Sequence, residues 1–179
     1  AAEAVERVVG YAFERLATAT IPNALAVIRE IGHASGTSGL IGGQLLDLDA
    51  STKTAGGRED IARRKTAALI TASVVAGGLA GNGSAAAITR LRRYGAALGL
   101  AFQLIDDLHD GDGLVAAHGS QDVHRRASNL IDEATEMLKP FGPKARLLHA
   151  LAQWLARNGE PASGPRRESA TTGRTHAPA

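Results

Sequence analysis

Apolar positions recur along this chain with the spacing of helix faces, and the clearest stripe lies near its middle. Six residues there follow intervals of three and four, which places them on one side of an α-helix: Ile88, Leu91, Gly95, Leu98, Phe102 and Ile105. No β-branched stretch alternates between apolar and polar residues as a half-buried strand would. The pattern therefore predicts an all-α fold.

Turn-forming residues divide this pattern into about six helices. We expect helices over residues 1–18 and 23–50, a third with Glu59 and Asp60 in its first turn, a fourth from the N-cap candidate Ser84 to Gly111, and two more near 121–138 and 144–157. Trp154, in the last of these, is expected in the core or at an interface. Residues 1–158 would then form one helical domain.

The last segment, 159–179, differs in composition from the rest. It is rich in Pro, Gly, Ser, Thr and Arg and has no apolar residue larger than Ala. Such a segment cannot bury enough apolar surface to offset the entropy lost on ordering, so we expect a disordered tail.

Composition and charge narrow the function classes. The 179 residues include no Cys, which excludes disulfides and thiolate metal sites and suits a cytoplasmic location. The formal net charge is +2, and no block of Lys and Arg marks a nucleic-acid-binding face. We expect no transmembrane segment, because the longest weakly polar run, 67–81, is too short to span a bilayer. The chain starts with Ala and its only Met is Met137, so we expect the native start upstream.

An acidic stripe follows the apolar one. Gln103, Asp106, Asp107 and Asp110 lie at i, i+3, i+4 and i+7, so a helix would place them on one side. Neighbouring carboxylates repel each other, and three of them favour a bound cation. Hard oxygen ligands suit Mg²⁺, which binds through one or two carboxylates plus substrate phosphates. The alternative is an acidic helix end exposed to water.

Two shorter motifs precede the stripe. Gln44 and Asp47, in the string GGQLLD, would share a helix face among glycines that allow close approach of a ligand or a neighbouring backbone. They could equally be a surface pair on a closely packed helix. Lys65 and Thr66 can bind a phosphate as a point charge plus a hydroxyl, or can simply be solvated.

The order and spacing of these motifs resemble the C-terminal half of the trans-isoprenyl diphosphate synthases, the polyprenyl synthetase family of farnesyl and geranylgeranyl diphosphate synthases. The matching residues are Gly42, Gly43, Gln44, Asp47, Lys65, Thr66, Gly95, Gly99, Leu100, Ala101, Phe102, Gln103, Asp106, Asp107 and Asp110. The resemblance covers roughly residues 8–158 and is densest between 32 and 110.

This resemblance implies a fold and an activity. It implies part of an isoprenoid synthase-type helical bundle, working as a homodimer or heterodimer. The implied reaction is the Mg²⁺-dependent condensation of an allylic prenyl diphosphate with isopentenyl diphosphate in isoprenoid biosynthesis. The metal ligands would be Asp106, Asp107 and Asp110, and the diphosphate would contact Lys65 and Gln103. These two would also act in catalysis, with Thr66, Gln44, Asp47 and Phe102 around the reacting end.

The sequence departs from the family pattern in two places that affect function. It has no second DDxxD motif. It also has no Lys between Lys65 and Lys139, so its binding of phosphate must be weaker or must depend on Arg. Two alternatives therefore stay open. One is a non-catalytic, synthase-like subunit that binds and modulates a true synthase. The other is an Asp-rich terpenoid enzyme that ionises a prenyl diphosphate without isopentenyl diphosphate, against which the GGQ and KT strings argue.

Overall fold

The computed structural model describes residues 2–49 and 54–159, and this part of the chain contains helices and no strand. The elements are α1 (Ala2–Thr18), α2 (Ala24–Ser35), α3 (Leu40–Leu48), α4 (Ala55–Ala62), the π-helical segment η2 (Arg63–Ala67), α5 (Ala68–Ala80), α6 (Ala85–Asp110), α7 (Gly113–His118), α8 (Ser120–Leu138), the 3-10 segment η3 (Lys139–Ala145) and α9 (Arg146–Gly159). The predicted all-α fold is confirmed. Among the described residues, no helix has the length and apolarity needed to cross a membrane.

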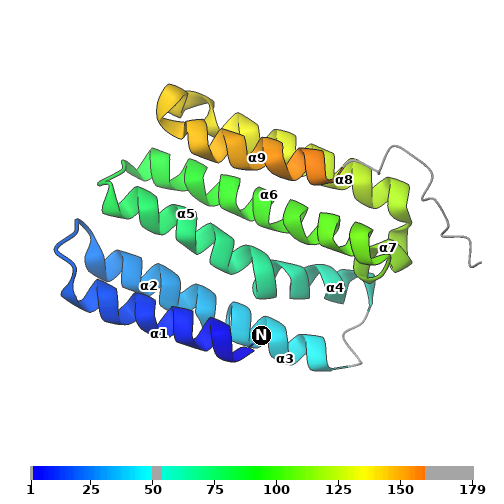
Figure 1. The fold of residues 1–179 in the computed structure, drawn as a ribbon, viewed down its shortest axis with the longest axis horizontal. Coiled ribbons are helices and arrows are strands. Elements are labelled where there is room, and N and C mark those ends of the chain that lie inside the picture. Colours follow the sequence, from blue (N-terminus) through cyan, green and yellow to red (C-terminus); the bar gives the residue numbers. More distant parts are fainter. Residues whose placement is uncertain (1, 50–53, 160–179) are drawn as a thin grey trace, which may run out of the picture.

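Helix α6 lies at the centre of the bundle. It packs on α5 along one side and on α8 along the other, while α2 covers α5 and α9 covers α8 (Figure 1). Side chains from several faces of α6 are buried, including Tyr94, Leu98 and Leu104. The hydroxyl of Tyr94 donates a hydrogen bond to the carbonyl oxygen of Leu148 at 2.9 Å, which links α6 to α9.

Two glycines let α6 approach the preceding helix closely. A Cβ atom added at Gly95 would lie 2.6 Å from the Cα of Thr71, and one at Gly99 would lie 2.6 Å from the Cα of Ala67. Real Cβ atoms do not come this near to a backbone carbon. The two glycines therefore set the spacing of α6 from η2 and α5, and so the distance between the residues that these segments carry.

Several expectations for α6 are confirmed. Ser84 caps its N-terminus by accepting a hydrogen bond from the backbone N–H of Ala87 at 3.2 Å. Gly111 ends it in the left-handed conformation, with φ of 72°. Most of the apolar stripe is buried or half-buried, but Phe102 is 40% exposed.

The helix expected over 23–50 is interrupted, so this expectation is wrong. The chain leaves the helical conformation at Gly36, with ψ of −161°, and α3 begins after Gly39. A Cβ at Gly39 would overlap the backbone of Ala34, so the bend depends on the absence of a side chain there. The expected end of this helix at residue 50 lies outside the described residues.

The third helix also starts earlier than expected. Thr54 is the N-cap of α4, and its hydroxyl oxygen accepts a hydrogen bond from the N–H of Gly57 at 3.2 Å. Glu59 and Asp60 therefore lie beyond the first turn, because a side-chain cap outweighs the helix-breaking tendency of the glycines after it. Trp154 is 50% exposed, which excludes it from the core of the described chain. The tail is expected over residues 159–179; Gly159 instead ends α9, and residues 160–179 lie outside the described residues.

Candidate functional site

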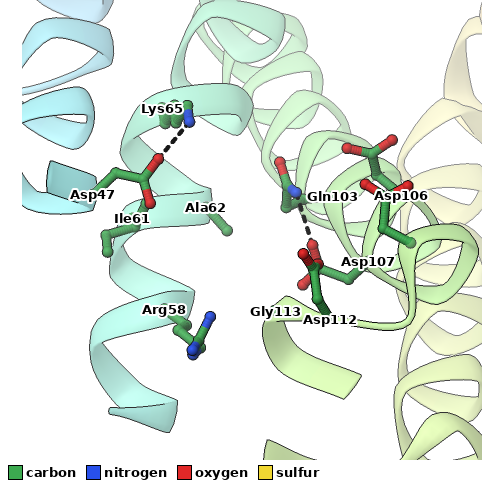
Figure 2. A pocket seen from close by; sticks show the side chains of 11 residues that line it. Asp47, Arg58, Ile61, Ala62, Lys65, Gln103, Asp106, Asp107, Asp112 and Gly113 are labelled. Carbon is green, nitrogen blue, oxygen red and sulfur yellow. Dashed lines mark hydrogen bonds and ion pairs between the residues drawn. The ribbon is translucent and has the colours of Figure 1, made fainter. Parts of the chain in front are cut away.

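A cavity of about 340 Å³ opens between the segment α4–η2 on one side and the ends of α6 and α7 on the other (Figure 2). Its lining is dominated by charged and polar side chains. The lining residues are Asp47, Arg58, Ile61, Ala62, Lys65, Gln103, Asp106, Asp107, Asp110, Asp112 and Gly113. The cavity thus joins residues that are up to 66 positions apart in the sequence, from Asp47 to Gly113.

The basic wall of the cavity comes from α4 and η2. Arg58 and Lys65 lie on the same side of this segment, across the cavity from Asp106 and Asp107 (Figure 2). Lys65 lies in a π-helical turn, a departure from α-helical geometry that occurs often at functional sites. Its Nζ atom is 2.6 Å from the Oδ2 atom of Asp47.

Helix α3 brings Asp47 to this wall through a close backbone contact. A Cβ atom at Gly43 would lie 2.6 Å from the backbone nitrogen of Lys65, so only glycine allows α3 to pack directly on η2. Gly43 is buried. The glycines of the GGQLLD string therefore position an ion pair at the edge of the cavity, in addition to packing two helices.

The opposite wall is fixed by a row of hydrogen bonds. Thr66 Oγ1 donates to Gln103 Oε1 at 2.9 Å, and Gln103 Nε2 donates to Asp107 Oδ1 at 2.9 Å. The other carboxylate oxygen of Asp107 accepts a bond from the N–H of Leu114 at 2.8 Å. Asp107 is only 7% exposed. This row ties η2, α6 and α7 together and gives the Asp107 carboxylate one orientation.

Asp106 and Asp110 differ from Asp107 in their surroundings. Both are exposed, and neither has a hydrogen-bond or ion-pair partner in the part of the chain that the structure describes. Among the described residues, no three His, Asp or Glu side chains are arranged as a ready-made metal site. Two free carboxylates beside a basic wall nevertheless fit Mg²⁺, which uses few protein ligands when a phosphate completes its shell.

A partly exposed charge cluster links α4 to α8. Glu59 accepts hydrogen bonds from Arg126 at 2.6 Å and from Arg63 at 2.8 Å. Burial acts to raise the pKa of Glu59, but these two guanidinium groups outweigh it, and the pKa lies below its ordinary value of 4.5. The cluster fixes the segment that presents Arg58 and Lys65.

The polyprenyl synthetase family model matches residues 6–127, which include every lining residue of the cavity. The chain belongs to the polyprenyl synthetase family. The resemblance found in the sequence is confirmed.

Named relatives of the chain agree with the family match. It is 32% identical to geranylgeranyl pyrophosphate synthase 7 of Arabidopsis thaliana, over 85% of this chain and 52% of the relative. It is 34% identical to farnesyl diphosphate synthase of Escherichia coli, over 80% of this chain and 58% of the relative. A putative farnesyl-diphosphate synthase from Marinomonas matches with a TM-score of 0.74 and 32% identity, covering 82% and 58% of the two chains. The chain thus spans a little over half the length of these relatives.

The structure gathers most of the predicted site residues around one cavity. Asp47, Lys65, Gln103 and the three aspartates Asp106, Asp107 and Asp110 line it, and Thr66 is bonded to one of them. Gln44 and Phe102 are exposed and do not line it. The roles assigned to all these residues stay predictions.

Five lining residues are not among the site residues predicted from the sequence: Arg58, Ile61, Ala62, Asp112 and Gly113. For Arg58 a signal exists. Arg58, Ile61, Ala62 and Lys65 follow helical spacing of i, i+3, i+4 and i+7, which places both cations on one face. Asp112 and Gly113 follow α6 in a turn whose path the sequence pattern does not define.

Proposed function

We propose that this chain works in a prenyltransferase that condenses an allylic prenyl diphosphate with isopentenyl diphosphate. The observation that carries the proposal is one cavity lined by Lys65 together with Asp106, Asp107 and Asp110, in which Lys65 lies across from Asp106 and Asp107 (Figure 2). A diphosphate that carries Mg²⁺ needs carboxylates to bind the metal and a cationic side chain to bind its phosphate oxygens. The names of the relatives, which are farnesyl and geranylgeranyl synthases, support this substrate class.

In the proposed reaction the chain binds and orients, and it needs no protein nucleophile. The bond between the allylic carbon and the diphosphate oxygen breaks, and the diphosphate leaves with the electron pair. The double bond of isopentenyl diphosphate then attacks the allylic carbon, and the product loses a proton. Lys65 holds the departing diphosphate, and Asp106 and Asp110 face it with their free carboxylates. Magnesium, held there, would neutralise charge on the leaving group.

The hydrogen-bonded row of Thr66, Gln103 and Asp107 fixes the side-chain orientations of the proposed site. Gln103 is bonded on both ends of its amide, to Thr66 and to Asp107, so its orientation does not depend on the ligand. Preorganised polar groups of this kind need no rearrangement when charge develops on the substrate. Asp47 is placed to orient Lys65 through their ion pair. Gln44 and Phe102 are proposed, by family resemblance only, to approach the reacting end.

The partners follow from the same proposal. We expect a homodimer or a heterodimer with a related subunit, and a cytoplasmic location. The alternative of a non-catalytic modulating subunit is not favoured, because the relatives that the chain matches are named as synthases. No second DDxxD occurs in the sequence, so the proposed reaction needs carboxylates that this chain does not contribute.

Calorimetry with a non-hydrolysable allylic thiolodiphosphate tests the proposal. The unaltered chain should bind this analogue more tightly with Mg²⁺ than without it. The double variant Asp106→Asn, Asp110→Asn should lose the magnesium-dependent part, at least about tenfold in affinity, while leaving the row at Asp107 intact. Asp132→Asn with Glu133→Gln, two exposed positions on α8, removes the same charge elsewhere. Undiminished magnesium-dependent binding by the first variant would refute the assigned site.

A further inference from the structure

Arg58 differs from the other arginines around it in having no partner. Arg63 and Arg64 pair with the carboxylates one helical turn earlier, Glu59 at 2.8 Å and Asp60 at 2.9 Å. The residue one turn before Arg58 is Thr54 and the residue one turn after it is Ala62, and neither side chain carries a charge. Among the described residues the guanidinium group of Arg58 makes no hydrogen bond and no ion pair, although Arg58 lines the cavity.

The other cation of the cavity is already engaged. The Nζ atom of Lys65 is 2.6 Å from Asp47, so part of its charge is neutralised before any ligand arrives. The cavity also contains the carboxylates of α6 and Asp112, but among the described residues no hydrogen bond or ion pair joins any of them to Arg58. Arg58 is therefore the cation of this cavity that is left uncompensated in the described chain.

The sequence offers no second lysine to this site from α6, α7 or α8. No Lys occurs between Lys65 and Lys139, so the turn after α6 and the whole of α7 and α8 contribute no lysine to the cavity. A diphosphate carries several negative charges, and Lys65 alone offers one ammonium group to it. A guanidinium group offers parallel N–H donors in a fork that matches two phosphate oxygens.

We propose that Arg58 is a diphosphate-binding residue of this protein, and that its guanidinium group supplies the second cationic contact in the cavity. The inference rests on the proposed function, since it concerns the same ligand. Arg58 would hold the diphosphate from the α4 side. It lies on the same face as Lys65 and about two turns before it (Figure 2). The ion pair between Glu59 and Arg126 keeps α4 in place. The competing explanation is that Arg58 only balances the acidic wall at long range.

The test measures the affinity of the full chain for inorganic pyrophosphate in the presence of Mg²⁺, by calorimetry. Arg58→Gln should weaken binding by about 10- to 100-fold, the size expected for a lost charge-assisted fork. Arg58→Lys should give an intermediate affinity, because it keeps the charge and loses the fork. Arg93→Gln is the matched control, since Arg93 is an exposed arginine on α6 outside the cavity. Its affinity should be unchanged.

Different outcomes separate this inference from the proposed function. Arg58→Gln binding like the unaltered chain, while Lys65→Gln binds more weakly, would overturn the role of Arg58 and leave the diphosphate site standing. An equal loss in Arg93→Gln would also overturn it, because the effect would then be one of net charge. No binding by the folded, unaltered chain would overturn both proposals. The circular dichroism melt of Arg58→Gln should match that of the unaltered chain, since Arg58 has no partner to lose.

Discussion

The close approach of α5 and α6 at Gly95 gives a prediction whose size can be worked out. A Cβ atom at this position would lie 2.6 Å from the Cα of Thr71, about 0.8 Å nearer than ordinary van der Waals contact at 3.4 Å. The atom in the way belongs to the backbone of α5, so no rotamer change relieves the overlap. Gly95→Ala must therefore move the two helices apart.

Two opposing terms set the free-energy change. Overpacking of a tight core costs roughly 1–3 kcal/mol. Replacing a helical glycine by alanine returns about 0.5–1 kcal/mol of backbone entropy and propensity. Gly77→Ala is the matched control, because Gly77 is also helical, lies in α5 and has nothing within 4 Å of its Cβ position. The difference in unfolding free energy between the two variants then isolates the packing term, at roughly 1–3 kcal/mol.

Urea denaturation of both variants, followed by far-UV circular dichroism and by the fluorescence of Trp154, measures this difference. Trp154 is the only tryptophan of the chain, so its signal has one source. We expect Gly95→Ala to be less stable than the unaltered protein and Gly77→Ala to be slightly more stable. Equal stability of the two variants, with unchanged m-values, would refute the packing of α6 on α5 described above.

Three further predictions concern titration and the cavity wall. Burial raises the pKa of Tyr94 to about 12. In a Tyr11→Phe background, Tyr94 is the remaining tyrosine, and its absorbance should show ionisation near that pH. The free energy of unfolding should fall by roughly 2–3 kcal/mol as pH rises from 10 to 12. The lowered pKa of Glu59 contributes stability that is present above 4.5 and is lost as pH falls through the lowered value. Glu59→Gln should therefore cost about 1 kcal/mol at neutral pH and flatten the dependence of Tm on pH below 4.5. Gly113→Ala should destabilise the protein by at least about 1 kcal/mol and weaken magnesium-dependent pyrophosphate binding, because its φ is 56° and its Cβ would overlap the Asp107 carboxylate.

Each of these has an outcome that would contradict it. A tyrosine titration midpoint near 10 in the first variant would mean that Tyr94 is accessible to water. An unchanged acid dependence of Tm in Glu59→Gln would exclude its pairs with the two arginines as a source of stability. For the cavity wall the control is Gly111→Ala, which has a similar positive φ of 72° and nothing within 4 Å. Equal loss of binding in both glycine variants would attribute the effect to backbone strain alone.

The sequence predicts the central helix well because one pattern specifies it. The stripe ending at Ile105 and the caps Ser84 and Gly111 all indicate the same element, and the structure confirms it. The exposure of Phe102 could not be predicted, because periodicity identifies a helix face without showing what covers each part of it. The break between α2 and α3 was missed for a related reason. Glycines that serve a bend and glycines that serve close helix packing have the same appearance in a sequence.

The candidate site was predictable where its residues form contiguous motifs. The string from Phe102 to Asp110 and the pair Lys65–Thr66 identified both walls of the cavity. Arg58 was missed because it belongs to no contiguous motif, although its spacing from Lys65 indicates a shared face. The bond between Thr66 and Gln103 joins residues 37 positions apart, and only the packing at Gly99 brings them within reach.

The bond from the Leu114 amide to Asp107 has a consequence for how this protein can change over time. This one carboxylate faces the cavity and also fixes the start of α7, since its Oδ2 atom accepts the Leu114 N–H at 2.8 Å. A substitution at Asp107 would alter the ligand site and, in the same step, the route that the chain takes out of α6. Natural selection on ligand binding and natural selection on folding therefore act on a single side chain. A lineage that lost the activity would still be expected to keep an acid at this position, so its retention alone does not show that an enzyme is active.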